Sequence, residues 1–399
     1  MLTEAEATPD AIRDRIRAFL AEHDPAEMAK EDFNNARFDA GLAWVHYPEG
    51  LGGLGVSRAL QNVVDTEFAA AGAPGHNAEL NAIGLGMAAP TILAYGSDEQ
   101  QKRWLRELWT GREIWCQLFS EPGAGSDLAA LATRAVQDGE EWVANGQKVW
   151  TSLAQHARRA LLVARTDPDV PKHAGLTYFA VDMTDPGVEV RPLRQITGEA
   201  EFNEVFLTDV RVPDANRLGP EGGGWKVATT TLNNERVAIG SMAGSGRETG
   251  MIGKVADAWR AEPQLRNPAM HDELMRLWVD AEVARLTALR LRQRLTAGQP
   301  GPEGAGMKVT FSRLAQAISG FEIELHPESG LRYDDWTMRQ PEGVDFTGRE
   351  PGYRYLRAKG NSIEGGTSEI LRNTIAERIL GLPPEHRVDK DIAYKDLEK

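Results

Sequence analysis

The stretch WCQLFSEPGAGSD, residues 115–127, lies where the pattern of the sequence changes from helical to β-like. From residue 1 to about 115, apolar residues recur at helical spacing, for example at Ile12, Ile16 and Phe19. After it, up to about residue 225, short β-type runs are separated by turn residues, with no intervening helical segment. The sequence therefore predicts a helical domain followed by an antiparallel β-barrel or β-sandwich.

The helical spacing returns after this β block and predicts a third domain that is again helical. The predicted fold is thus α+β and multidomain, with domains over residues 1–115, 116–225 and 226–384. The last residues, 385–399, are rich in charge, and we expect them to form a mobile tail.

The composition limits the classes of protein to which the chain can belong. The 399 residues are 41% hydrophobic and 26% charged, as in soluble globular proteins, and the net charge of −14 opposes binding to nucleic acid. No run of 18 apolar residues is present, so we expect no membrane span. The acidic first ten residues lack the apolar region of a secretion signal. Cys116 is the single cysteine, which excludes a disulfide framework and a cysteine-rich metal site and agrees with a reducing cytoplasm.

The segment SEPGAGSD, residues 120–127, has the features of a ligand-binding loop. Gly123 and Gly125 allow backbone amides to approach a bound group closely, and the hydroxyls of Ser120 and Ser126 add hydrogen-bond donors. Such a loop suits an anionic or carbonyl-rich cofactor. A plain turn, with Asp127 capping a short helix, explains the same residues equally well.

Further along the β block, Asn145-Gly146 is a strong signal for a two-residue hairpin, so we expect a tight turn there. Trp150 follows at the end of the next predicted strand. Its indole suits either packing in a core or stacking on an aromatic cofactor, and the spacing alone does not decide between them.

Another segment, GLGGLG at residues 50–55, matches the glycine pattern of dinucleotide-binding folds. That fold needs a second parallel strand after the following helix, whereas the next segment here is again helical. The pattern therefore favours a tight glycine-rich loop between helices.

Taken together, three motifs resemble the acyl-CoA dehydrogenase family. They are WCQLFSEPGAGSD, then NGQKVWTS at residues 145–152, and GGTSEI at 365–370 followed by Arg372-Asn373 and Ala376-Glu377-Arg378. The resemblance covers nearly the whole chain. It implies an N-terminal helical domain, a middle β domain and a C-terminal four-helix bundle. It also implies FAD, an acyl-CoA substrate, an electron-transfer flavoprotein as electron acceptor, and a homodimer or homotetramer.

The resemblance also assigns binding residues. The first two motifs supply residues expected along the flavin and the third supplies contacts near its phosphate–ribityl part: Gln117, Phe119, Ser120, Gly125, Ser126, Trp150, Ser152, Thr367 and Glu369. Ser126 also borders the thioester region of the substrate. Asn233 and Arg236, about one turn apart on a predicted helix, are candidates for contacts with CoA or the acyl chain.

The resemblance assigns the catalytic base less directly, because the chain departs from the commonest pattern of the family. Many members carry Glu immediately before the Gly-Thr of the third motif, but this chain has Gly365 there and Glu364 one residue earlier. A second group of members places the base before an Arg on the first helix of the C-terminal domain, as in Glu235-Arg236. We therefore expect Glu235 to be the base, with Glu364 as the second candidate.

Two segments that contact a neighbouring subunit in the family also differ. Arg247-Glu248-Thr249-Gly250 and Pro327-Glu328-Ser329-Gly330 stand where the family has an Arg-x-x-Phe-Gly and a Gln-x-x-Gly-Gly segment. A hetero-oligomer with a related subunit, as in some sterol side-chain dehydrogenases, is therefore an alternative. An acyl-CoA oxidase, a flavin monooxygenase and a non-catalytic DNA-binding flavoprotein remain as other functions, the last of which the charge of −14 opposes.

Overall fold

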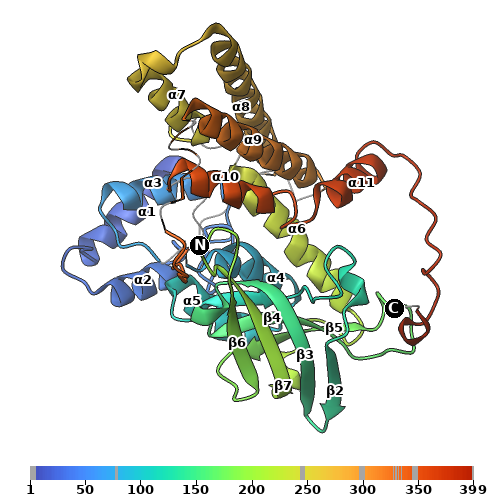
Figure 1. Ribbon diagram of the computed structural model, residues 1–399. Coiled ribbons are helices and arrows are strands. Elements are labelled where there is room, and N and C mark those ends of the chain that lie inside the picture. The colour runs from blue at the N-terminus through green and yellow to red at the C-terminus, as the bar shows by residue number, and fades with distance from the viewer. Residues whose placement is uncertain are drawn as a thin grey trace.

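The computed structural model describes residues 6–76, 80–242, 248–295, 302–326, 328, 330, 332–333, 335–343 and 349–397. Helices from the two ends of the chain lie on one side, and a curled sheet of strands lies below them (Figure 1). This order confirms the predicted fold class of an N-terminal helical domain, a middle β domain and C-terminal helices.

The helical spacing of the sequence predicts each of the N-terminal helices except the second. They are α1 (Pro9–Glu22), α2 (Lys30–Asp39), α3 (Gln61–Ala70), α4 (Ala89–Tyr95) and α5 (Asp98–Thr110). The start of α5 is fixed by a capping box, because Ser97 and Gln100 each bond the other's backbone amide. Gly111 ends the helix with a φ of +79°, a left-handed conformation that glycine adopts without strain.

The middle domain is one seven-stranded sheet with the order β1-β4-β2-β3-β7-β6, and β5 also pairs with β4. Its strands are β1 (Trp115–Leu118), β2 (Arg134–Asp138), β3 (Glu141–Ser152), β4 (Arg159–Arg165), β5 (Leu176–Asp182), β6 (Val188–Leu193) and β7 (Phe202–Pro213). Most pairs are antiparallel, but β1 and β2 each run parallel to β4.

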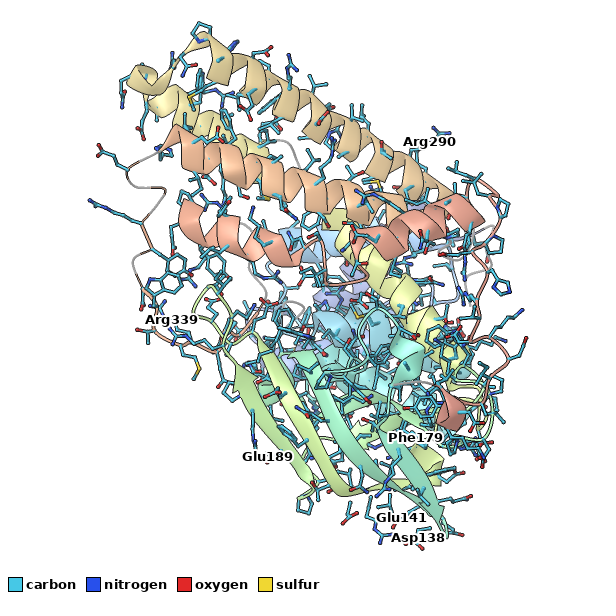
Figure 2. All side chains as sticks on the ribbon, turned by 45° about the vertical axis from the view of Figure 1, so that its right-hand side comes forward. Asp138, Glu141, Phe179, Glu189, Arg290 and Arg339 are labelled. Atoms are coloured by element: carbon cyan, nitrogen blue, oxygen red, sulfur yellow. The ribbon has the colours of Figure 1, made fainter. Side chains whose placement is uncertain are left out.

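The hairpin expected at Asn145-Gly146 is wrong, because both residues lie inside the continuous strand β3. The turn lies at Gly139, between β2 and β3, and Figure 2 shows Asp138 and Glu141 at its tip. The register of β3 against β7 shifts between Ala144 and Gly146, which marks an irregularity of the β-bulge type. Asn145 exchanges two hydrogen bonds with Asp209 across it, so the turn-forming residues serve a bulge.

The C-terminal helices are α6 (Gly224–Met242), α7 (Met251–Ala261), α8 (Pro268–Leu295), α9 (Gly304–Leu325), α10 (Pro351–Gly360) and α11 (Ser368–Arg378). The helical spacing of the sequence predicts α6, α8, α9 and α11, but it does not predict α7 or α10. Trp259, Leu274 and Phe321 form part of the core that joins α7, α8 and α9. In the described parts of the chain, no helix is both long and apolar enough to cross a membrane.

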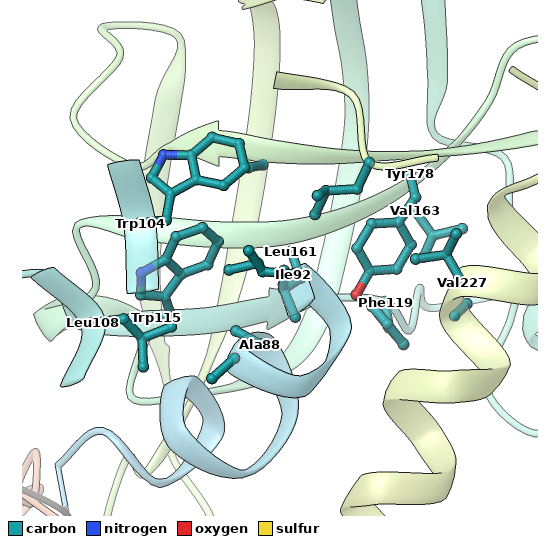
Figure 3. Close-up of a cluster of buried hydrophobic side chains, with 14 of the residues drawn as sticks. Ala88, Ile92, Trp104, Leu108, Trp115, Phe119, Leu161, Val163, Tyr178 and Val227 are labelled. Atoms are coloured by element: carbon teal, nitrogen blue, oxygen red, sulfur yellow. The ribbon is translucent and has the colours of Figure 1, made fainter. Parts of the chain in front are cut away.

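The first core cluster joins all three parts of the fold. Trp104 of α5 and Trp115 of β1 lie ring to edge at 5.7 Å, and Tyr178 of β5 and Val227 of α6 belong to the same cluster (Figure 3). Because burial of large aromatic side chains contributes strongly to stability, the N-terminal helices and the sheet depend on each other. Contacts with the N-terminal helices and with the rest of the sheet therefore both fix the position of β1.

The expectation of a mobile tail is wrong for the described residues 388–397. From α11 the chain runs as an extended segment to the middle domain, where its end lies beside the sheet (Figure 1). There Tyr394 is buried, and its backbone amide donates to the oxygen of Val170. The charges of the tail do not keep it in solvent, because several of them find partners on the middle domain.

The glycine-rich segment at residues 50–55 forms a tight loop, as predicted. Gly50, Gly52 and Gly55 have φ between +67° and +85°. Gly53 packs so closely that an added Cβ would lie 2.0 Å from the backbone oxygen of Tyr47. The loop therefore closes on its own backbone.

We expect Gly53→Ala to lower the free energy of unfolding by about 1–3 kcal/mol, because the new methyl group would collide with backbone that cannot move aside. Thermal unfolding measures the effect. Gly320→Ala in α9 is the matched control, since an added Cβ there meets nothing within 4 Å, and it should leave the protein unchanged or slightly more stable. Equal melting temperatures for Gly53→Ala and the parent chain would contradict this account of the loop.

Candidate functional site

A buried ion pair joins the first two motifs. Lys148 of β3 has no exposure to solvent, and its Nζ lies 2.8 Å from Oε1 of Glu121. The same Nζ donates to the backbone oxygens of Phe119 and Val163, each at 3.0 Å. All three hydrogens of the ammonium group therefore have acceptors, as burial of a charge requires.

The carboxylate of Glu121 also fixes the residues just before β2. It accepts hydrogen bonds from the amides of Ala132 at 2.7 Å and Thr133 at 2.9 Å. Burial raises the pKa of Glu121, but the charge of Lys148 and these hydrogen bonds outweigh burial and leave the pKa below its ordinary value. For Lys148 burial has the larger effect. It lowers the pKa of the ammonium group to about 8, although the charge of Glu121 acts to raise that pKa. The pair thus ties the start of the SEPGAGSD loop and the residues just before β2 to β3.

Trp150 has an unusual backbone conformation for its residue type. Its φ is +60°, and its side chain is 58% exposed although its neighbours Val149 and Thr151 are buried. The register of β3 against β7 shifts again between Lys148 and Thr151, and the amide of Val149 donates to the oxygen of Ser120 at 2.9 Å. Left-handed conformations of bulky residues persist where the surroundings impose them, and they cluster at ligand-binding sites.

The second and third motifs are linked through packed side chains. The ring of Trp150 lies edge-on to the ring of Phe202 in β7 at 5.9 Å. The guanidinium of Arg357 in α10 lies 5.7 Å from the ring of Phe202. Arg357 donates to both carboxylate oxygens of Glu364 at 3.0 Å and to both of Glu201 at 3.0 Å. The chain segment before GGTSEI is therefore tied to the sheet next to Trp150.

These contacts bear on the choice of base, because Glu364 is engaged by an arginine that is only 4% exposed. Burial lowers the pKa of Arg357, but the carboxylates of Glu364 and Glu201 outweigh burial and raise it overall. Burial raises the pKa of Glu201, in opposition to Arg357. A carboxylate held in such a pair is better suited to joining domains than to accepting a proton.

Gly365 and Gly366, at the start of the third motif, have φ of +61° and +91°.

Glu235, the first candidate for the base, lies on α6 and is 8% exposed. Its Oε2 lies 3.4 Å from Nε2 of Gln117 on β1. One turn earlier, the buried Thr231 bonds Thr91 of α4 and Tyr178 of β5, each at 2.9 Å. These bonds hold the helix so that Glu235 faces the strand that leads into the SEPGAGSD loop.

The other expected site residues lie in varied surroundings. Phe119 is buried against Tyr178 at 5.9 Å, while Gly125 and Ser126 are exposed. Thr367 caps α11 through the amide of Ile370, and Glu369 is exposed on that helix. The half-exposed residues are Ser120, Ser152 and Asn233. The side chain of Arg236 lies outside the described residues, as do Arg247, Pro327 and Ser329.

The residues around Trp150 and Gln117 fit a flavin. Oε1 of Gln117 and Oγ1 of Thr151 are buried and have no hydrogen-bond partner among the described residues, and such atoms call for a ligand or water. The exposed indole of Trp150, which precedes Thr151 in β3, offers an aromatic face to solvent. Ring stacking together with unsatisfied polar atoms is what a flat heterocycle with polar edges requires.

Three residues that the sequence analysis did not select have large roles here: Lys148, Thr231 and Arg357. Lys148 stands inside the NGQKVWTS motif, which was the available signal, because a lysine that a strand buries needs a charged partner. Thr231 and Arg357 carry no comparable signal, since their partners are distant in sequence.

Comparison with known proteins identifies the family. Three family models match in succession: acyl-CoA dehydrogenase N-terminal domain at residues 6–112, middle domain at 116–210 and C-terminal domain at 222–380. The fold and the site thus define an FAD-binding oxidoreductase. The chain belongs to the acyl-CoA dehydrogenase family.

Named relatives agree with this assignment. The chain is 41% identical over 374 residues to acyl-CoA dehydrogenase FadE34 of Mycobacterium tuberculosis, covering 93% of this chain but 49% of that protein. It is 37% identical to acyl-CoA dehydrogenase IpdE1 of the same organism, over 91% of this chain and 90% of the relative. Among solved structures, the Tcur3481-Tcur3483 steroid ACAD has a TM-score of 0.71 at 27% identity, covering 94% of this chain and 98% of that one. The ChsE4-ChsE5 complex from Mycobacterium tuberculosis has a TM-score of 0.69 at 30% identity, with the same coverage.

We expect Lys148→Met to destabilise the protein by about 3–5 kcal/mol, because it leaves the Glu121 carboxylate buried without its cation. The double variant Lys148→Met/Glu121→Gln should recover part of this loss, since it removes the unpaired charge. Denaturant unfolding of both variants measures the difference. Arg276→Ala, which breaks an exposed ion pair with Asp272, is the control and should not shift the midpoint. A Lys148→Met variant as stable as this control would show that the pair does not hold the loop.

Proposed function

We propose that the chain oxidises the Cα–Cβ bond of an acyl-CoA thioester to the trans-2-enoyl-CoA, with Glu235 as the base. In this reaction the Cα–H bond breaks, its proton goes to the carboxylate, and its electron pair forms the π bond between Cα and Cβ. The hydrogen on Cβ leaves with the electron pair of the Cβ–H bond as a hydride, and a bound FAD would supply the acceptor for that hydride. The observation that carries the proposal is the contact of Glu235 with Gln117, which lies on β1 just before the SEPGAGSD loop.

The surroundings of Glu235 support this role. Its burial limits access of water, which would otherwise compete for the proton, and Thr231 holds its helix in place. The amide of Gln117 donates to Oε2 of Glu235, which orients the carboxylate that would accept the proton. We place Gln117, Phe119, Ser120, Gly125, Ser126, Trp150 and Ser152 along the flavin, and Thr367 and Glu369 near its phosphate–ribityl part.

The substrate end of the site is part of the same proposal. We place Ser126 beside the thioester, and Asn233 and Arg236 beside CoA or the acyl chain, because Asn233 lies half-buried on the helix that carries Glu235. For the acyl group we propose a bulky, polycyclic class. The support is the similarity over 94% of the chain to the solved steroid ACAD.

For the electron acceptor we propose an electron-transfer flavoprotein, with the cytoplasm as the place of reaction. The support is the family membership and a single buried cysteine, Cys116, which has no need of an oxidising compartment. Reaction of the reduced flavin with oxygen, as in an oxidase or a monooxygenase, is the competing outcome.

The test is anaerobic bleaching of the flavin by a panel of straight-chain, branched and steroid acyl-CoA thioesters. We expect Glu235→Gln to keep its yellow colour and to slow bleaching by about 10²–10⁴-fold, because the amide cannot accept the proton. Glu364→Gln is the matched control and should bleach at nearly the parent rate, with lower stability from the weakened contact with Arg357.

The reverse pattern, with fast bleaching of Glu235→Gln and slow bleaching of Glu364→Gln, would transfer the role of base to Glu364.

Admission of air to the reduced sample then distinguishes the two electron acceptors, an electron-transfer flavoprotein and oxygen. Slow reoxidation that an electron-transfer flavoprotein accelerates supports the proposed partner, whereas immediate reoxidation by oxygen supports the oxidase.

We further propose that the chain works as an oligomer. On α8 the exposed side chains of Met275, Val279, Val283 and Leu286 are spaced three or four residues apart, and an apolar stripe of this kind on a helix favours contact with another chain. A homodimer or homotetramer is the simpler assembly. The similarity to the ChsE4-ChsE5 complex supports a hetero-oligomer with a related subunit as the alternative.

Native mass spectrometry of the chain expressed alone, together with its FAD content, tests this proposal. We expect a mass of two or four chains with one FAD per chain, because the apolar stripe would otherwise face water. An FAD-free monomer that gains FAD when a related subunit is co-expressed would establish the hetero-oligomer. A monomer that carries a full complement of FAD would contradict both forms of the proposal.

A further inference from the structure

The C-terminal tail crosses from α11 to the middle domain and docks beside the loop between β4 and β5. Ala393 forms an antiparallel bridge with Pro171, and the amide of Lys395 donates to the oxygen of Pro168 at 3.0 Å. Lys395 also pairs with Asp169 at 2.6 Å. Backbone pairing and charge together give the tail a defined register on this surface.

The centre of this contact is Tyr394, which covers the guanidinium of Arg165. Cζ of Arg165 lies 3.4 Å from the centre of the Tyr394 ring, and the two residues are 4% and 9% exposed. A cation that packs against an aromatic face away from water is held more strongly than one at the surface. The ring therefore closes one face of a buried cation.

The edge of the same guanidinium holds the segment that follows SEPGAGSD. Arg165 donates to the backbone oxygens of Ala129 at 2.6 Å and Leu131 at 3.2 Å, and the hydroxyl of Tyr394 donates to the oxygen between them, that of Ala130, at 3.3 Å. The carbonyl groups of residues 129–131 are thus fixed by Arg165 and Tyr394, directly before the two residues whose amides bond Glu121.

A second contact reaches the loop itself through Lys172. Its Nζ lies 2.7 Å from Asp127, the last residue of SEPGAGSD, and 2.5 Å from Asp389 of the tail. Lys172 is 8% exposed, so the two carboxylates share a largely buried cation. The tail therefore supplies a second carboxylate to the cation that binds Asp127, next to Ser126.

We propose that residues 387–397 act as a positioning strap for the cofactor loop: by covering Arg165 and sharing Lys172, the tail holds residues 120–131 in the conformation that retains FAD. The proposal rests on the placement of FAD along this loop given above. The strap acts through Arg165 and Lys172 and does not itself touch the reacting atoms.

The experiment compares the release of FAD from the full-length holoprotein, from Tyr394→Ala and from a chain that ends at residue 384. Release is followed without substrate by the fluorescence of free flavin, so the result does not depend on which residue is the base. We expect release about tenfold faster for Tyr394→Ala, because the loss of a desolvated cation–π contact is of this order. Tyr394→Phe keeps the ring and should stay close to the parent rate.

Two further measurements separate positioning from general destabilisation. A peptide of residues 385–397, added to the shortened chain, should restore slow release, and steady-state kinetics of Tyr394→Ala should show a raised KM with a nearly unchanged kcat. Val388→Ala, at a tail side chain that is 81% exposed, should behave as the parent chain. Release at the parent rate from both Tyr394→Ala and the shortened chain would overturn the proposal. A Tyr394→Phe variant as impaired as Tyr394→Ala, with melting temperatures lowered to the same extent, would also overturn it.

Discussion

Burial of the Lys148 ammonium group is the constraint on which the site depends. A buried cation is tolerated only when its hydrogens and its charge are matched, and Glu121 with two backbone oxygens supplies that match. The requirement forces the SEPGAGSD loop against β3, so Ser120 and Trp150 lie on adjoining segments. Two motifs that are separated in the sequence thus form one structural unit.

Other parts of the chain are arranged around this unit. On one side α6 is held by Thr231 and presents Glu235 to Gln117, and on another Arg357 ties α10 and the third motif to the sheet next to Trp150. Behind the loop, Arg165 fixes the residues that follow it, with Tyr394 over its face. Each of these contacts comes from a different element, so the conformation of the loop depends on the packing of several parts of the chain.

Local signals in the sequence predict local structure well. The capping box at Ser97 and the glycine at 111 are local signals that fix the ends of α5, and the change of period at the first motif marks the start of the sheet. These features depend on neighbouring residues, which the sequence displays directly.

The features that the sequence does not predict depend on distant partners. Asn145-Gly146 has the composition of a turn, but Asp209 of β7 satisfies Asn145 inside a continuous strand. The charged tail resembles a mobile segment because its partners, Lys172 and Asp169, lie more than two hundred residues earlier. Glu364 is a candidate base by position, and only the fold reveals that Arg357 engages both of its oxygens.

The central claim is that the unit formed by Glu121 and Lys148 places a flavin between Trp150 and Gln117, with Glu235 facing the substrate. A crystal structure of the protein with FAD and an unreactive acyl-CoA analogue tests this claim most directly. The account predicts the isoalloxazine ring against Trp150 and Ser120, and a carboxylate oxygen of Glu235 within contact of the Cα atom of the analogue. An isoalloxazine bound away from both motifs, or a Glu235 carboxylate out of reach of that carbon, would contradict it.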